Sequence, residues 1–101
     1  MLNKPKLYEK VLRDFHARFI NEAALIKAGI AAGDLATSRR RAHSTKGLAG
    51  TIGADDLQAA ALALEQALTQ EQPDAALVER FASELARILT SIGNGFGIGA
   101  D

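Results

Sequence analysis

The sequence contains no cysteine and no tryptophan, only two prolines, and aromatic residues at just 5% of its length. The absence of cysteine excludes disulfide bonds and thiolate chemistry, and it is typical of a reducing compartment. No apolar run approaches the roughly 18 residues that a membrane-spanning helix needs, and the first residues lack the apolar core of a signal peptide. We therefore expect a cytoplasmic chain without direct membrane contact, either free or as the cytoplasmic part of a larger membrane-bound protein.

An excess of charge of either sign is also missing, because twelve basic residues balance twelve acidic ones. Zero net charge argues against a general nucleic-acid binder. Aliphatic residues, by contrast, are abundant: hydrophobic residues make up 48% of the 101 positions, enough for the core of one small domain. No stretch alternates apolar and polar residues as a strand does, and no internal repeat is present.

Four segments carry apolar residues at offsets of three and four, which is the pattern of an amphipathic helix. The first runs from about residue 6 to 32 and is either one helix or two helices with a kink near Asn21. The others run from Asp34 to Gly53, from about Asp55, and from Pro73 to Ile92. The buried stripes predicted for the four segments are Leu12, Phe15, Phe19, Ala23, Ile26 and Ile30; Leu35, Ser38, Ala42, Thr45, Ala49 and Ile52; Leu57, Ala61, Leu64 and Leu68; and Leu77 or Val78, Phe81, Leu85, Ile88 and Ile92.

Glycine, proline and polar residues mark the predicted helix ends. Gly33 suits a helix C-cap, and Asp34 can cap the next helix because its carboxylate accepts from free N–H groups of the first turn. Asp55 and Gln58 resemble a capping box at the start of the third helix. Pro73 suits the first turn of the fourth helix.

The links between these helices are short, which places consecutive helices side by side in opposite directions. We therefore predict an all-α fold, an antiparallel up-down four-helix bundle over residues 1–92, monomeric in solution. The glycine-rich residues 93–101 have neither period nor bulk, and we expect them to form a flexible tail.

The segment RRRAHSTKGLAG, residues 39–50, combines basic residues with glycine inside a predicted helix. On one helix face, at offsets of 0, 3, 4 and 7, stand His43, Lys46, Gly47 and Gly50. Glycine weakens a helix interior by about 1 kcal/mol relative to alanine. Two glycines on one stripe therefore indicate that a partner approaches it closely. Arg39 and Arg40 extend the same face by one turn toward the N-terminus.

The motif AHSTKGLAGTIGA resembles the signature of histidine-containing phosphotransfer (HPt) domains, and the stretches LYEKVLRDF and LALEQAL resemble its flanking helices. The resemblance covers roughly residues 6–90. One position departs from the family pattern, because the second residue after the histidine is usually leucine and here is Thr45. That position faces the predicted core, so the change concerns local packing, and the threonine hydroxyl can bond a carbonyl one turn back.

The resemblance implies a phosphorelay intermediate, in which the imidazole of His43 takes a phosphoryl group from a receiver-domain aspartate and passes it to another receiver. Lys46 would stabilise phosphoryl charge. Clearance for the receiver and steering of its acidic pocket would come from Gly47, Gly50, Arg39 and Arg40. The receivers would belong to response regulators or to a hybrid histidine kinase, and this chain would be a free protein or the C-terminal domain of such a kinase.

The same resemblance implies a phosphoryl carrier rather than an enzyme. No glycine-rich ATP loop is present, so autonomous kinase activity is not expected. The chain would bind no cofactor and no metal, because the Mg²⁺ needed for transfer would be held by the acidic residues of the receiver.

Glu65 is a further candidate, reached by geometry. His43 lies ten residues before Gly53 and Glu65 lies twelve after it, so an antiparallel hairpin with a rise of about 1.5 Å per residue puts the two at similar heights. A carboxylate accepting from Nδ1–H of His43 would fix the tautomer and leave Nε2 as the nucleophile. Pairing of Glu65 with a nearby cation is the alternative.

Two other functions stay open at this point. A helical adaptor would pack its glycine stripe against a partner helix, and His43 would then be dispensable. A nucleic-acid binder would use the arginine run 39–41, although zero net charge and the few aromatic residues count against it. His16 has no basic or glycine neighbours at helical spacing and is interpreted as a solvated helix residue.

Overall fold

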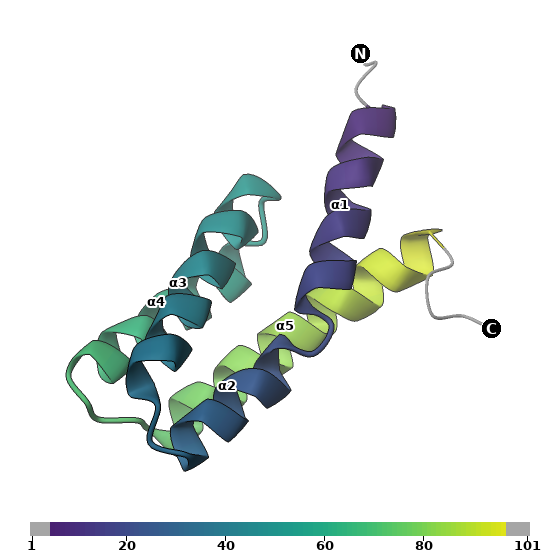
Figure 1. Ribbon diagram of the computed structural model, residues 1–101. Coiled ribbons are helices and arrows are strands. Elements are labelled where there is room, and N and C mark those ends of the chain that lie inside the picture. The colour runs from purple at the N-terminus through teal and green to yellow at the C-terminus, as the bar shows by residue number, and fades with distance from the viewer. Residues whose placement is uncertain (1–4, 97–101) are drawn as a thin grey trace.

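The structure, a computed structural model, describes residues 5–96, which form five helices joined by short connections (Figure 1). They are α1 (Pro5–Phe19), α2 (Glu22–Ala31), α3 (Leu35–Thr51), α4 (Asp55–Thr69) and α5 (Ala75–Phe96). No strand occurs between residues 5 and 96, so the predicted all-α class is confirmed for that part of the chain. Within the same residues, none of the helices combines the length and the apolar character needed to span a bilayer.

The first predicted segment forms two helices, because the chain turns at Ile20 and Asn21 between α1 and α2 (Figure 1). Asparagine is a poor helix-interior residue, since its side chain competes for backbone hydrogen bonds. The side chain of Asn21 does not cap α2, and its carbonyl accepts from the N–H of Leu25 at 3.0 Å. The turn leaves Ile20 exposed and brings Glu22 inward, where the residue is only 4% exposed.

The connections after α2, α3 and α4 share one pattern of backbone hydrogen bonds. After each helix one residue adopts a positive φ, and the next N–H reaches back to a carbonyl in the last turn. Gly33 and Gly53, with φ of 81° and 79°, occupy this position after α2 and α3. After α4 the position is held by Glu71, with φ of 55°, a conformation that residues with a Cβ rarely adopt.

The predicted starts of α3 and α4 are both confirmed, but the predicted cap is present only at α3. Asp34 caps α3, its Oδ1 accepting a 3.2 Å hydrogen bond from the N–H of Thr37. Hydrogen bonding from Thr37, through its side chain first and this N–H second, favours the charged carboxylate and lowers the pKa of Asp34. The capping box predicted at Asp55 and Gln58 is wrong, because Ala54 is the N-cap of α4 and no side chain bonds there.

Both ends of α5 differ from the predicted fourth helix. The helix starts at Ala75 rather than at Pro73, and Asp74 Oδ1 accepts from the N–H of Ala76 at 2.8 Å. At its C-terminal end α5 continues through Phe96, so residues 93–96 of the predicted tail are helical. The rest of that tail, residues 97–101, lies outside the described residues.

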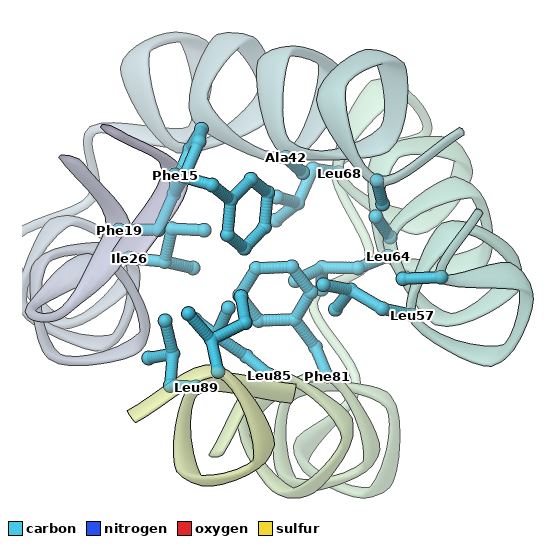
Figure 2. Packing of buried hydrophobic residues seen from close by; sticks show 14 residues of the cluster. Phe15, Phe19, Ile26, Ala42, Leu57, Leu64, Leu68, Phe81, Leu85 and Leu89 are labelled. Atoms are coloured by element: carbon cyan, nitrogen blue, oxygen red, sulfur yellow. The ribbon is translucent and has the colours of Figure 1, made fainter. Parts of the chain in front are cut away.

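The core forms where the predicted stripes meet (Figure 2). Phe15 and Phe19 bring an aromatic pair from α1, with ring centroids 4.6 Å apart. α3 contributes only small buried side chains, namely Ser38, Ala42, Thr45 and Ala49. α4 contributes larger ones together with alanine, namely Leu57, Ala60, Ala61, Leu64 and Leu68. Small residues on one helix let the other helix approach closely, so α3 and α4 form the tightest pair of the fold. Leu89 of α5 is also buried, which the predicted stripe of that helix missed.

A matched pair of leucines on α4 tests this core. Leu64 is fully buried, whereas Leu62, two residues earlier, is 40% exposed. Leu64→Ala leaves a cavity and is expected to lower the free energy of unfolding by about 2–5 kcal/mol. Leu62→Ala is expected to change it by less than about 1 kcal/mol. Urea denaturation followed by circular dichroism measures both, and equal losses in the two variants would contradict the assignment of Leu64 to the core.

Candidate functional site

The site lies on the hairpin of α3 and α4, which run side by side in opposite directions from the short connection after Thr51 (Figure 1). Two pairs of residues define their register. The ring of His43 on α3 meets the carboxylate of Glu65 on α4, and a Cβ on Gly50 would collide with the side-chain amide of Gln58. Gly50 follows His43 by as many residues as Gln58 precedes Glu65, as antiparallel helices require.

The imidazole of His43 stands at the surface, with its side chain 64% exposed, whereas that of Glu65 is only 18% exposed. The Nδ1 atom of His43 lies 2.8 Å from Oε2 of Glu65. An ionised carboxylate only accepts hydrogen bonds, so Nδ1 carries the hydrogen and donates it. In the neutral ring the lone pair is then on Nε2. The structure thus brings together the two residues that the hairpin geometry predicts to face each other.

Lys46 reaches the other oxygen of the same carboxylate. Its Nζ atom lies 2.9 Å from Oε1 of Glu65, and the lysine side chain is 26% exposed. We describe this contact as an ion pair, because no donor among residues 5–96 approaches Oε1 at an angle suitable for a hydrogen bond. Oε1 itself is buried. Both partners considered for Glu65, the histidine and a cation, are therefore present at once, one on each oxygen.

Opposing effects act on the pKa of Glu65. Partial burial by itself raises the pKa, because it disfavours the charged form. The contacts with Lys46 and His43 act in the other direction and together outweigh burial, so the pKa of Glu65 is below its ordinary value. The carboxylate is therefore ionised at neutral pH and holds the ring of His43 in one tautomer.

The two glycines of the His43 face differ in their surroundings. Gly47 is exposed, and a Cβ built on it would meet nothing within 4 Å. Gly50 is half-buried, and Gln58 of α4 covers it. Open backbone next to His43 is therefore found at Gly47, one turn further along α3.

Arg39 and Arg40 also differ in their surroundings. Arg40 is exposed, and its Nη2 donates to the hydroxyl of Thr37 at 3.2 Å. Arg39 is half-buried and lines a hollow between the start of α3 and the end of α4, together with Asp34 and Glu71. Arg39 thus lies toward the end of α4, whereas Arg40 lines a different hollow with residues of α1 and α2.

The departure at Thr45 is accommodated as predicted, because the buried hydroxyl donates to the carbonyl of Arg41 at 2.9 Å. The side chain of Arg41 forms a pair that the sequence reasoning missed. Its Nη1 donates to both carboxylate oxygens of buried Glu22, at 3.1 and 3.3 Å. The available signal was the position of Glu22 on the apolar stripe between Phe19 and Ile26, where a carboxylate requires a cation.

Metal binding finds no support in this part of the molecule. Among residues 5–96 no group of three or more histidine or acidic side chains is placed to hold an ion. His16, the second histidine, lies in the last turn of α1 and is half-buried rather than fully solvated as predicted.

The site thus consists of an exposed histidine on a helical hairpin, with its Nδ1 bound to a carboxylate and a lysine beside it. These features are those of an all-helical domain with a surface histidine as its central residue. The family model of the Hpt domain matches residues 10–94, and the chain belongs to this family. Membership implies a phosphotransfer role in two-component signalling, and Hpt domains generally interact with receiver domains. No curated protein and no solved structure matches the chain.

The balance of effects at Glu65 gives a prediction. In the wild type, NMR titration of the Glu65 carboxyl carbon should give a midpoint below the ordinary value of 4.5. In the double variant His43→Ala, Lys46→Ala, both partners that oppose burial are removed, and the pKa of Glu65 should rise relative to the wild type. Because the pKa of Glu65 is lower in the folded state, the ionised carboxylate stabilises the fold at pH values above 4.5. This stabilisation is lost as the pH falls through the pKa of the folded state. An unchanged midpoint in the double variant would contradict this account of the site.

Proposed function

We propose that this domain is a phosphorelay intermediate in which Nε2 of His43 accepts a phosphoryl group from a receiver-domain aspartate and passes it to a second receiver. The proposal rests on the fixed orientation of the His43 imidazole ring. Its Nδ1 side is tied to Glu65 at 2.8 Å, while the ring as a whole stays exposed. An imidazole in this state offers a neutral nucleophilic nitrogen to a partner at the surface.

The transfer step conserves charge and atoms without a further reactant. The lone pair of Nε2 attacks phosphorus, the P–N bond forms, and the P–O bond to the aspartate breaks with its electron pair leaving on the carboxylate. The phosphorylated ring of His43 keeps the hydrogen on Nδ1 and gains positive charge, which the adjacent carboxylate of Glu65 balances. Attack by the aspartate of a second receiver reverses these steps and restores the neutral ring.

Lys46 has a double role in this proposal. One part of its ammonium group faces Glu65, 2.9 Å away, and its remaining N–H donors are available to phosphoryl oxygens. A positive charge held close to the transferring group stabilises the negative charge that it carries. Glu65 therefore positions both the nucleophile and the cation.

The domain acts as a carrier and not as a kinase. Mg²⁺ belongs to the acidic residues of the receiver, and no cofactor is held by this chain. The carrier is a monomeric antiparallel up-down bundle that works in the cytoplasm. It is either a free protein or the C-terminal domain of a hybrid sensor histidine kinase, and its receivers belong to response regulators or to such a kinase. Gly47, with its open backbone, and the half-covered Gly50 lie on the docking face.

Substitution of His43 and substitution of Lys46 should have different effects on phosphoryl transfer. His43→Gln removes the nucleophile, so labelled phosphoryl uptake from a phosphorylated receiver should fall to background while binding to the receiver persists. Lys46→Ala removes a charged contact worth on the order of 1.5–3 kcal/mol, so transfer should slow by about tenfold to a hundredfold. His16→Gln is the matched control and should behave as wild type.

A double-mutant cycle separates the two roles of Lys46. If Lys46 acts only by holding Glu65, then Lys46→Ala added to Glu65→Gln should cause no further loss. If it also contacts the phosphoryl group, the double variant should be slower than Glu65→Gln alone. Normal uptake of acid-labile phosphate by His43→Gln would overturn the proposed function, and an adaptor role for the glycine face would replace it.

Gly47 should show opposite effects on stability and on transfer. Gly47→Gln restores helix propensity in open space, so stability should rise by up to about 1 kcal/mol, while the new side chain obstructs the receiver and slows transfer. Gly95→Gln is the control, because Gly95 is also open and lies on α5. It should leave transfer unchanged. If transfer rates in the two variants are equal, the open backbone at Gly47 is not part of the docking face.

A further inference from the structure

A second feature borders His43 on the side of α3 that faces α2. A hollow of about 370 Å³ lies there, beginning at Ser44, the residue that follows His43. Arginines from two elements line it, Arg18 from α1 and both Arg40 and Arg41 from α3. Glu22 is the acidic residue in this lining, so the formal charge of the hollow is +2.

The three arginines are not equivalent. Arg41 is engaged, because its Nη1 donates to both oxygens of Glu22 and so uses the negative charge of the hollow. Among residues 5–96 neither Arg18 nor Arg40 forms an ion pair, although the charge of Arg40 contributes to the lowered pKa of Asp34. The guanidinium of Arg18 lies 5.2 Å from the centre of the Phe19 ring, and that of Arg40 bonds the hydroxyl of Thr37. Two exposed positive charges thus line the hollow, and neither is engaged in an ion pair.

The opposite side of His43 has a different character. There, Lys46 and Glu65 compensate each other at 2.9 Å, and Gln58 covers Gly50. Further along, the hollow beside Arg39 also contains Asp34 and Glu71, which gives it a formal charge of −1. A negatively charged partner is therefore attracted to the α2 side of His43 and not to the α4 side.

We propose that Arg18 and Arg40 form the specificity-determining contact for the receiver, gripping an acidic segment next to its phosphorylated aspartate, with the exposed side chain of Leu25 as the apolar contact at the rim. This inference rests on the proposed function, because the occupant is the receiver that exchanges the phosphoryl group with His43. Leu25 supports it, since this leucine lines the same hollow and is 45% exposed. The charge complementarity selects an acidic partner surface, and the hollow fixes the side from which it approaches.

The test measures transfer from a panel of phosphorylated receivers to the charge-reversed variant Arg18→Glu, Arg40→Glu. The receiver concentration for half-maximal rate should rise by about tenfold or more, and the rate at saturation should stay within about twofold of wild type, because the nucleophile is untouched. The difference should shrink at high salt. Arg18→Lys, Arg40→Lys keeps both charges and should largely restore the wild-type value. Should the charge-reversed variant fail to fold by circular dichroism, Arg18→Gln, Arg40→Gln takes its place with a smaller effect of the same kind.

The control is Arg80→Glu, an exposed arginine on α5 outside the hollow. A similar loss in Arg80→Glu and in the charge-reversed variant would overturn the proposal. Chemical phosphorylation by phosphoramidate distinguishes the failures. If phosphoramidate phosphorylates His43 of the wild type but no receiver does, the proposed function is wrong. The proposal that a receiver binds the hollow is then wrong as well. If receivers transfer normally to the charge-reversed variant while random duplex DNA binds the wild type and not the variant, the hollow serves nucleic acid instead.

Discussion

The close approach of α3 to α4 is the constraint on which the site depends. The fully buried side chains of α3 are all small, including Ala42 and Ala49, and α4 packs against them with leucines. This packing fixes the height of one helix against the other, and a slip of one turn would separate Glu65 from His43 by about 5.4 Å. The short connection closed at Gly53 sets the same register from the end of the hairpin. Core packing thus positions the contact between Glu65 and His43 at the surface.

The elements of the fold follow from the sequence wherever one local signal determines them. Asp34 caps α3 because its carboxylate reaches the N–H of Thr37, an interaction within a single turn. Features that depend on tertiary context were missed. Glu71 takes a left-handed conformation that glycine usually supplies, and its residue type gives no hint of this. Ala54 caps α4 because the turn after α3 places it there, although Asp55 carries the better capping side chain.

The site was predictable in outline, because helix periodicity and hairpin length place His43, Lys46 and Glu65 within reach of each other. The sharing of one carboxylate between histidine and lysine is a three-dimensional result, since two oxygens of Glu65 face two different residues of α3. Periodicity also put Gly47 and Gly50 on one face without showing that α4 covers only the second. Coverage depends on the neighbouring helix, and a pattern within one helix contains no information about it.

The central claim is that Nε2 of His43 carries the phosphoryl group while Nδ1 keeps its hydrogen on Glu65. Heteronuclear NMR of the ¹⁵N-labelled, phosphorylated protein tests it most directly, because phosphorus couples to the ring nitrogen to which it is bound. The account predicts one phosphohistidine, with ³¹P coupled to Nε2 of His43 and a slowly exchanging hydrogen retained on Nδ1. Coupling of ³¹P to Nδ1, or phosphate on a residue other than His43, would contradict it.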